Sequence, residues 1–574
     1  MTNADIVDIL EQTTKLLELH NDDPFKIRSY QSTAFNLDKL TEDITELPAT
    51  ELVKLPGIGK SMANKIREII DTGHLNELDT LLSQTPEGVL DMFRIKGIGP
   101  KKIRTIWHEL GIENLRDLQL ACENGQIATL KGFGASTQEK ILSSLEFLQS
   151  QSGKIRMDKA DALAGVLRDA IAPQVDRVEI SGQVRRKAQE VDTIQLLIGT
   201  SQLRATMNAL NTIPFLHQHA AESSPFAWRG SMDGTEVAIE LLLYPANQLD
   251  RQLFIHTAAE AHLKQAGQAG QTLLQAAMSG DDTTETAIYD RAGLPYIVPE
   301  MREDAFAFRW SAYHQADELV TWDDLRGTLH NHSTWSDGKH TLGQMADATR
   351  ELGLSYFGIA DHSQTAAYAN GLKPQQVREQ HADIDRLNEQ YGPDFQILKG
   401  IESDILGDGS LDYETDTLAL FDYVVASVHQ NLNMAIDKAT ARLIKAIENP
   451  YTTILGHPTG RLLLARAGYP IDHKAVIDAC AAHHVIIEIN ASPYRLDIDW
   501  RWIDYAMQQG VMLSINPDAH STTGLLDMHY GIAIGRKGGL TRKMTFNALT
   551  LPEMKAWLAD RKQRKGIELP ANSR

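Results

Sequence analysis

The sequence predicts a multidomain α/β protein, and three observations lead to this fold class. Residues 1–150 read as almost entirely helical, with glycine-rich turns between the helices. Residues 151–310 mix short apolar strands with helices, and a polar connector follows at 311–325. In residues 326–574, short apolar runs alternate with amphipathic helical stretches, which is the pattern of parallel βα units. We therefore expect a helical domain, an α+β domain and a carboxy-terminal barrel, and 574 residues suffice for several cores.

Composition limits the partners and the compartment. The formal net charge of −20 argues against DNA affinity driven by overall charge, so a DNA partner would have to meet local basic patches. The two cysteines, Cys122 and Cys480, give no disulfide framework and fit a reducing cytoplasm. The first residues have neither a basic end nor an apolar stretch, and no apolar run reaches about 18 residues. We expect a cytoplasmic protein with no membrane partner, favour a monomer, and expect the basic tail at 562–574 to be frayed.

Three related glycine motifs interrupt the helical region: Leu55-Pro-Gly-Ile-Gly-Lys60, Ile95-Lys-Gly-Ile-Gly-Pro-Lys101 and Leu130-Lys-Gly-Phe-Gly-Ala135. Paired glycines before a helix expose backbone N–H groups at its positive end, which suits a phosphate. Three copies at comparable spacing favour nucleic-acid binding over plain turns. The motifs resemble helix-hairpin-helix motifs, which bind nucleic-acid backbone without reading bases. The predicted DNA-binding residues are Gly57, Gly59, Lys60, Lys65, Gly97, Gly99, Lys101 and Lys102, with Lys96 and Arg104 adding positive charge.

Histidines and carboxylates end successive apolar runs of the carboxy-terminal region, where a barrel of parallel strands places its chemistry. The candidate metal ligands are His330, His332, Asp337, His362, Glu402, His429, His457, Asp518 and His520. Any one of them alone is more readily an ordinary barrel residue, but their common placement at strand ends favours a site. Nitrogen and oxygen ligands without cysteine suit Mn²⁺, Zn²⁺ or Fe²⁺, and nine ligands predict two or three divalent ions. Closely spaced ions activate a water and stabilise the attacking and leaving oxygens of a phosphoester displacement.

These residues stand in the motifs His-x-His-Ser, Ala-Asp-His, Gly-Ile-Glu, Val-His, Gly-His-Pro and Pro-Asp-Ala-His, which in this order resemble the PHP (polymerase and histidinol phosphatase) domain. The resemblance implies a distorted seven-stranded (βα)7 barrel with a trinuclear centre. It assigns the ligands as His330, His332, Glu402 and Asp518 for one ion, Glu402, His429 and His457 for a second, and Asp337, His362 and His520 for a third. Glu402, Asp518 and His429 would be central to catalysis. Arg461, or else Asn490 and Arg495 at another strand end, could bind a substrate phosphate.

The middle region resembles the palm and thumb of a bacterial family X DNA polymerase, most specifically at Gly182-Gln-Val-Arg-Arg186 and Gly293-Leu-Pro-Tyr-Ile-Val-Pro-Glu-Met-Arg-Glu303. This region departs from the family at the residues that would bind the nucleotide and its metal ions, and these departures decide whether we expect polymerase activity. Its nucleotide-binding Gly-Ser reads Gly182-Gln183, and its three metal-binding aspartates fall on Thr193, Gln195 and Ala238. Nucleotidyl transfer needs carboxylates to hold magnesium, so we expect a palm that holds DNA without polymerising. The nearby acids Glu190, Asp192 and Glu240 would require an odd shift in register, which turns side chains to the opposite face of the sheet.

Together these features predict a metal-dependent DNA phosphodiesterase that acts as a 3′-to-5′ exonuclease and trims 3′ ends in DNA repair. Its DNA partner would be a gapped, nicked or 3′-ended duplex, or a single strand. Three alternatives remain open: an active gap-filling polymerase that also carries this nuclease, a small-molecule phosphatase of the histidinol-phosphate type, and a non-enzymatic DNA-binding scaffold. The family can also include a lyase that removes a 5′-deoxyribose phosphate through a lysine Schiff base. The resemblance puts Lys65 at that nucleophile position, and a DNA-phosphate contact is the alternative role for Lys65.

Overall fold

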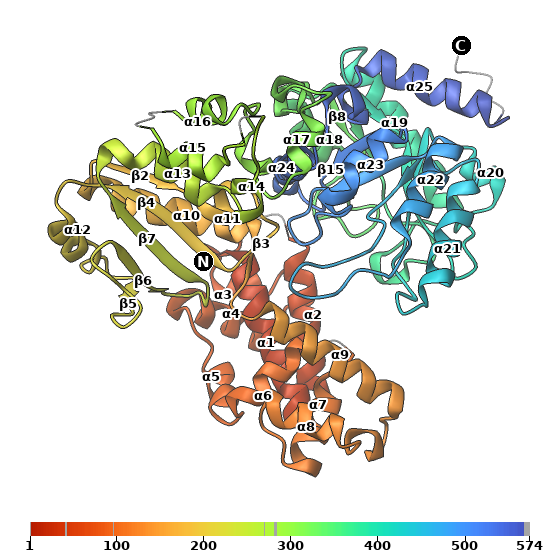
Figure 1. The fold of residues 1–574 in the computed structure, drawn as a ribbon. Helices are drawn as coiled ribbons and strands as arrows, with labels where there is room; N and C mark the ends of the chain where they lie inside the picture. Colours follow the sequence, from red (N-terminus) through yellow and green to blue (C-terminus); the bar gives the residue numbers. More distant parts are fainter. Residues whose placement is uncertain (1, 41–42, 96, 269, 281–283, 568–574) are drawn as a thin grey trace. The chain divides into compact units, whose positions relative to one another are not determined.

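The computed structural model describes residues 2–40, 43–95, 97–268, 270–280 and 284–567; Lys96 and the end of the basic tail, 568–574, lie outside these ranges. The chain separates into two compact units, Met1–Ser152 and Gly153–Arg574 (Figure 1). Across the described ranges, every helix is too short or too polar to span a bilayer. Each unit contains one of the two cysteines, and both thiols are buried.

The first unit consists of helices packed around α1 (Asn3–His20), whose Ile6, Leu10 and Leu17 are fully buried. The other helices are α2 (Pro24–Asp38), α3 (Ala49–Leu52), α4 (Lys60–Thr72), α5 (Asn76–Ser83), α6 (Glu87–Asp91), α7 (Pro100–Leu110), α8 (Leu115–Glu123) and α9 (Ala135–Gln151). The three glycine motifs have one geometry. The first glycine has a positive φ, and the second is the N-cap of α4, α7 or α9. No side chain caps any of these three helix starts, so their first N–H groups are left for solvent or a ligand.

The second unit begins with the palm, a sheet with the strand order β2-β4-β7-β6-β5. Its strands are β2 (Arg177–Ile180), β4 (Thr193–Gly199), β5 (Leu216–Gln218), β6 (Ala227–Met232) and β7 (Ala238–Tyr244), and a separate antiparallel pair joins β1 (Ile155–Arg156) to β3 (Glu190–Val191). Helix α10 (Met157–Ile171) packs on one face of the sheet and α13 (Leu249–Thr257) packs on part of the other. Strands β4 and β7 are parallel and place Gln195 opposite Glu240. Both side chains therefore lie on the face that α13 only partly covers.

The thumb region contains α14 (Glu260–Leu263), α15 (Leu273–Met278), α16 (Glu285–Ala292) and α17 (Phe306–Trp310). It is organised around Arg302, which is fully buried. The Arg302 guanidinium makes two hydrogen bonds to the Glu285 carboxylate, at 2.9 and 2.7 Å, and lies over the ring of Tyr289. A buried arginine is stable there because its charge is paired and its donors are used.

The barrel contains two parallel sheets, β10-β9-β8 and β11-β12-β13-β14-β15. The strands are β8 (Gly327–Thr328), β9 (Tyr356–Gly358), β10 (Gln396–Leu398), β11 (Gly400–Asp404), β12 (Tyr423–Ser427), β13 (Ile454–Leu455), β14 (Ile486–Asn490) and β15 (Leu513–Asn516). Because β10 and β11 are parts of one segment, the described strands amount to the seven that the PHP resemblance implied. Single bridges between His362 and Glu402 and between Asn331 and Ala519 join the two sheets into a ring.

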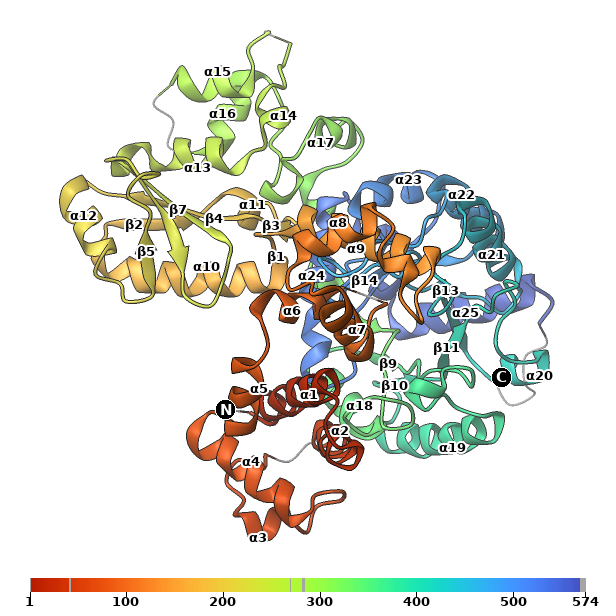
Figure 2. The ribbon, with the colours of Figure 1, turned by 90° about the horizontal axis from the view of Figure 1, so that it is seen from below.

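Helices surround the barrel strands, and Figure 2 shows α19, α21 and α22 on the outside. The barrel helices are α18 (Leu342–Glu351), α19 (Pro374–Tyr391), α20 (Thr415–Leu418), α21 (Ile436–Glu448), α22 (His473–His483), α23 (Ile503–Gln508), α24 (Met528–Lys537) and α25 (Leu551–Arg564). The palm and thumb pack directly on α24. The buried Lys537 Nζ donates to the carbonyl oxygens of Arg186 and Glu300, at 3.0 and 3.2 Å, and lies 2.5 Å from the Glu303 carboxylate.

Candidate metal centre

The barrel brings all nine predicted metal ligands together at the carboxyl ends of its strands. His330 and His332 follow β8, His362 follows β9, and Glu402 lies within β11. The remaining ligands follow β12, β13 and β15, except Asp337, which is on the loop after β8. Parallel strands present their carboxyl ends at one edge, so residues distant in sequence converge there.

Glu402 is the central group, because its two carboxylate oxygens contact different histidines. Oε1 lies 3.0 Å from His457 Nε2, 3.2 Å from His429 Nε2 and 3.3 Å from His330 Nε2. Oε2 lies 2.9 Å from His362 Nδ1. A carboxylate with neighbours on both oxygens is suited to bridge two ions.

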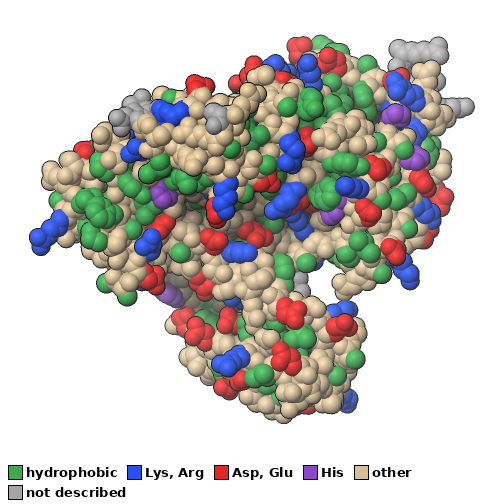
Figure 3. Space-filling view, viewed as in Figure 1, with side chains coloured by type: hydrophobic (Ala, Val, Ile, Leu, Met, Phe, Trp, Pro, Cys, Tyr) green, Lys and Arg blue, Asp and Glu red, His purple; other side chains and the backbone are tan. Residues whose placement is uncertain are grey.

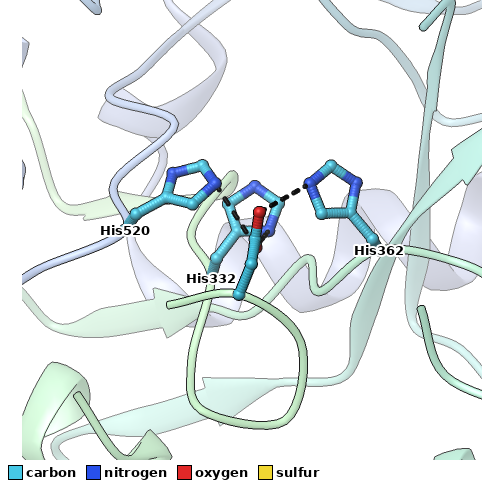
Figure 4. Close-up of side chains that lie close together, drawn as sticks. His332, His362 and His520 are labelled. Carbon is cyan, nitrogen blue, oxygen red and sulfur yellow. Dashed lines mark ion pairs between the residues drawn. The ribbon is translucent and has the colours of Figure 1, made fainter. Parts of the chain in front are cut away.

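Three sets of ligands have donor atoms within 4.8 Å of one another. They are His332, Asp337, His362 and His520; His330, His332 and Asp518; and His362, Glu402 and His429. Figure 4 shows the rings of His332, His362 and His520 gathered around one point. The sets differ from those implied by the PHP resemblance in three respects. Glu402 is not in the set of His330, His332 and Asp518. His362 joins Glu402 and His429 where His457 was expected, and His332 belongs to two sets.

Two carboxylates that sequence reasoning missed orient the histidines. Glu488 lies 2.7 Å from His330 Nδ1 and also accepts a hydrogen bond from Asn516 Nδ2 at 3.0 Å. Asp404 lies 2.5 Å from His429 Nδ1. Carboxylates in this position fix the tautomer and orientation of a ligating imidazole. The sequence held one signal for Glu488, which is an acid that interrupts the apolar run of β14.

The charges of the cluster are strongly coupled. Burial alone would raise the pKa of Glu402, but the neighbouring His429 and His330 hold that pKa well below its ordinary value. Burial would lower the pKa of His429, yet the charges of Glu402 and Asp404 raise it to about 10. Burial lowers the pKa of His332 to about 3, assisted by repulsion from His520. The site therefore combines ionised carboxylates with at least one neutral imidazole.

The donor set fits divalent metal ions. Within the part of the chain that the structure describes, no hydrogen-bond partner is found for the buried atoms His330 Nε2, His332 Nδ1 and Glu402 Oε2. An unsatisfied buried polar group costs about 1–3 kcal/mol, and coordination to a cation would remove this cost. Imidazole and carboxylate ligands without thiolate suit Zn²⁺, Mn²⁺ or Fe²⁺.

Comparisons with known proteins match this architecture. Family models match a helix-hairpin-helix domain at residues 1–75, a SAM-like helix-hairpin-helix tandem at 89–146 and a PHP domain at 328–492. A protein of Bacillus subtilis (strain 168) named DNA polymerase/3′-5′ exonuclease PolX is 33% identical over 571 residues, which cover 97% of this chain and 99% of that protein. The chain belongs to the PolX family.

Shorter relatives match about three tenths of this PolX-family chain. A probable phosphatase of Thermoanaerobacter sp. (strain X514) is 28% identical over 183 residues, covering 30% of the chain and 72% of the relative. A probable phosphatase of Escherichia coli O81 (strain ED1a) is 29% identical over 170 residues, covering 29% of the chain and 64% of the relative. PHP domains bind metal ions, and the barrel of this chain has clusters that could hold them.

The polymerase-like face of the palm holds a different network. Gln195 Nε2 donates to Glu240 Oε2 at 2.6 Å, and Arg229 Nε donates to Glu240 Oε1 at 2.8 Å. The expectation that Glu240 points to the opposite face was wrong. Glu240 is two residues from Ala238 and directly opposite Gln195, so it shares their face. Its carboxylate is nevertheless engaged by an arginine and an amide.

The other two acids near the palm face are also engaged. The Gln183 side chain accepts from the backbone N–H of Asp192 at 3.0 Å and donates to the Asp192 carboxylate at 3.2 Å. Glu190 lies 3.4 Å from Lys154 Nζ. Gln183, which replaces the serine of the nucleotide-binding turn, therefore binds Asp192, one of the acids that could have served as an alternative metal ligand.

In the first unit, Lys60 and Lys101 are exposed at the starts of α4 and α7, and Lys102 lies 5.5 Å from the Phe133 ring centre. Lys65 is half-buried, pairs with Glu77 and donates to Tyr30 Oη at 2.5 Å. Its predicted DNA-binding and lyase roles both stay predictions. On the face drawn in Figure 3, basic side chains lie among acidic ones. Any DNA contact on that face is therefore local, as the net charge of −20 indicated.

Two arginines considered for phosphate binding differ in their surroundings. Arg461 donates to the carbonyl oxygen of Arg495 at 2.8 Å and to Asp499 at 2.9 Å, so its guanidinium holds a loop. Arg495 extends toward the centre, with its Nε 3.5 Å from Asp518 Oδ2. The exposed Tyr368 lies beside the centre, with its ring 6.0 Å from that of His362. An arginine and an aromatic ring thus accompany the ligands, and neither was a leading candidate from sequence.

Proposed function

We propose that this PolX-family protein is a metal-dependent exonuclease that removes nucleotides from the 3′ ends of DNA during repair. The observation that carries the proposal is the convergence of nine nitrogen and oxygen ligands around Glu402 at one end of the barrel. Its substrates would be gapped, nicked or 3′-ended duplexes, or single strands. The family relationship supports the same activity, because the B. subtilis relative is named as a polymerase and 3′-5′ exonuclease.

Two or three ions, Mn²⁺, Zn²⁺ or Fe²⁺, would be held by the nine ligands and would supply a Lewis acid that activates water and neutralises phosphate charge. The chain's own groups prepare this chemistry. Asp404 and Glu488 accept from the Nδ1 atoms of His429 and His330, which leaves each Nε2 directed at Glu402. We assign the phosphate-binding cation to Arg495 in place of Arg461, because the Arg461 guanidinium is occupied by its loop.

The other two regions would bring DNA to this centre without adding chemistry. Uncapped helix starts at Gly59 and Gly99, beside Lys60 and Lys101, suit backbone phosphates. On the palm face at Gln195 and Ala238, Arg229 neutralises the nearest carboxylate, that of Glu240, and Gln195 also binds it. We therefore propose a palm that holds DNA and does not polymerise.

A small-molecule phosphatase is the second candidate, because two relatives that match about three tenths of the chain are named probable phosphatases. One experiment separates the candidates. A labelled primer-template is incubated with the protein and Mn²⁺, with and without dNTPs, alongside a simple phosphate monoester. Primer shortening supports the exonuclease, and extension with dNTPs would identify a polymerase. An intact primer with hydrolysed monoester would identify a phosphatase, and neither reaction would leave a scaffold.

A further inference from the structure

The loop 491–499, which follows β14 and carries Arg495, is held from two sides. On the barrel side, Arg461 donates to the Arg495 carbonyl oxygen and to Asp499. On the palm side, Gln189 Nε2 donates to the Leu496 carbonyl oxygen at 3.2 Å. The Arg156 guanidinium lies 3.8 Å from the centre of the Tyr494 ring. The residues before and after Arg495 are therefore both contacted by the palm.

The palm residues that make these contacts are themselves fixed. Arg156 and Gln189 are neighbours because β1 pairs with β3, and the Met157 N–H donates to the Gln189 carbonyl oxygen at 3.2 Å. Asp158 accepts two hydrogen bonds from the Arg156 guanidinium, at 3.1 and 2.9 Å. Met157 is 2% exposed and belongs to the same apolar core as Leu496. The β1–β3 pair is thus built into the barrel, although in sequence it belongs to the palm.

We propose that Gln189 and Arg156 are positioning residues of the nuclease, which hold the loop 491–499 so that Arg495 faces the metal centre. The palm, which lacks the polymerase carboxylates, would then support the phosphate-binding arm of a different active site. This inference rests on the proposed nuclease function for its kinetic consequences. A flexible arginine loses rotamer freedom when it binds a phosphate, and a loop fixed on both sides reduces that loss.

The kinetic test uses the full chain with Mn²⁺ and a labelled 3′-ended duplex. Gln189→Ala and Arg156→Ala should each raise KM for DNA about 5- to 10-fold and leave kcat within about 2-fold, because they weaken binding of the ground-state phosphate. Arg156→Lys keeps a cation over Tyr494 and should recover part of the loss. Arg177→Ala is the matched control, because Arg177 pairs with Glu179 and Asp250 inside the palm and should leave KM unchanged.

A double-mutant cycle distinguishes positioning from general damage. In an Arg495→Ala background, Gln189→Ala should change KM by less than about 2-fold, because the group through which it acts is gone. Metal content per chain should be the same in every variant. A full effect of Gln189→Ala on top of Arg495→Ala, or a fall in metal content, would overturn the inference.

A readout independent of activity completes the test. Hydrogen exchange of backbone amides in 491–499, followed by mass spectrometry, should be faster in Gln189→Ala and Arg156→Ala than in wild type or Arg177→Ala. Unchanged exchange would refute the positioning role whether or not the protein is a nuclease. If exchange accelerates as expected but wild type never shortens DNA, the proposed function fails while the link between palm and loop stands.

Discussion

The barrel centre and the palm face are both built at neighbouring parallel strands, yet they hold opposite kinds of network. In the barrel, Glu402 is surrounded by histidines, and among the described residues no hydrogen-bond partner is found for His330 Nε2, His332 Nδ1 and Glu402 Oε2. In the palm, Gln195 and Arg229 each bind one oxygen of the Glu240 carboxylate. The barrel centre gathers several such atoms around one carboxylate, whereas the Glu240 carboxylate is fully engaged, although Gln195 Oε1 beside it has no hydrogen-bond partner among the described residues. The surroundings of the two carboxylates thus distinguish a cluster that fits cations from a carboxylate held by an arginine and an amide.

The largest expected effect is the loss of exonuclease activity when the central carboxylate of the barrel is removed. Glu402→Ala should reduce exonuclease turnover by at least about 10³-fold, because the group that links the ligand sets is removed. Metal bound per chain, measured by elemental analysis, should fall with it, while the circular dichroism spectrum is retained. Glu240→Ala is the matched change on the palm and should leave exonuclease turnover and metal content unaltered. Undiminished cleavage by folded Glu402→Ala protein would place the active centre elsewhere.

The next largest effect is on the stability of the palm and thumb, to which we expect the buried Arg302–Glu285 pair to contribute. Glu285→Gln should lower the free energy of unfolding of the second unit by about 3–5 kcal/mol, because Arg302 would stay buried without its counter-charge. Urea unfolding measures the change. Glu260→Gln removes an exposed pair with Lys264 and should produce no measurable shift. Equal stability of the two variants would contradict the proposed role of the buried pair.

The same ion pair has a defined pH dependence. Burial raises the pKa of Glu285, but Arg302 and Arg185 together outweigh burial and bring the pKa to about 2, below the ordinary value of 4.5. A lowered carboxylate pKa stabilises the folded state above the unfolded-state value, so the stabilisation is complete above about pH 4.5. It disappears as pH falls through about 2. The stability difference between wild type and Glu285→Gln should therefore shrink over that interval.

A smaller effect sharpens the role of the helical unit. Replacing Lys60, Lys101 and Lys102 with alanine should flatten the slope of log K for DNA against log salt by about 0.7–0.9 for each phosphate that the protein no longer neutralises. Fluorescence anisotropy with a labelled duplex at several salt concentrations gives the slope. Replacing the exposed Lys54, which pairs with Glu51, serves as the control. An unchanged slope in the triple variant would argue against the hairpin interface.

The last prediction is that the palm does not incorporate nucleotides. A Glu402→Ala protein, freed of the competing exonuclease, should incorporate no dNTP into a gapped duplex even with Mn²⁺. Thr193, Gln195 and Ala238 cannot replace three anionic ligands, and Glu240 is engaged by Arg229. Extension by this variant that disappears on changing Asp192 or Glu240 would show that those acids serve as an alternative site.

The sequence was sufficient to predict that nine candidate ligands converge, because most of them follow an apolar strand and parallel strands place such residues at one edge. Their role as metal ligands stays a prediction. The sequence did not predict how they group, since the sharing of His362 and His332 between sets depends on loop paths. Glu488 was missed because a single acid inside an apolar run resembles a strand irregularity until its partners are known. The face of Glu240 was predictable from the two-residue period and was assigned wrongly. The contacts of Arg461 and Gln189 involve residues 34 and 307 positions away, which no local pattern reports.

The two buried cysteines give each compact unit its own chemical reporter. Cys122 belongs to the first unit, where burial raises the pKa of its thiol to about 11, and Cys480 belongs to the second, where burial raises the thiol pKa further. Neither thiol reacts readily while its unit is closed, because the reactive species is an accessible thiolate. Pulse labelling with a thiol reagent, followed by peptide mapping, would therefore time the opening of the helical unit and of the palm–barrel unit separately within a single sample, with no engineered probe.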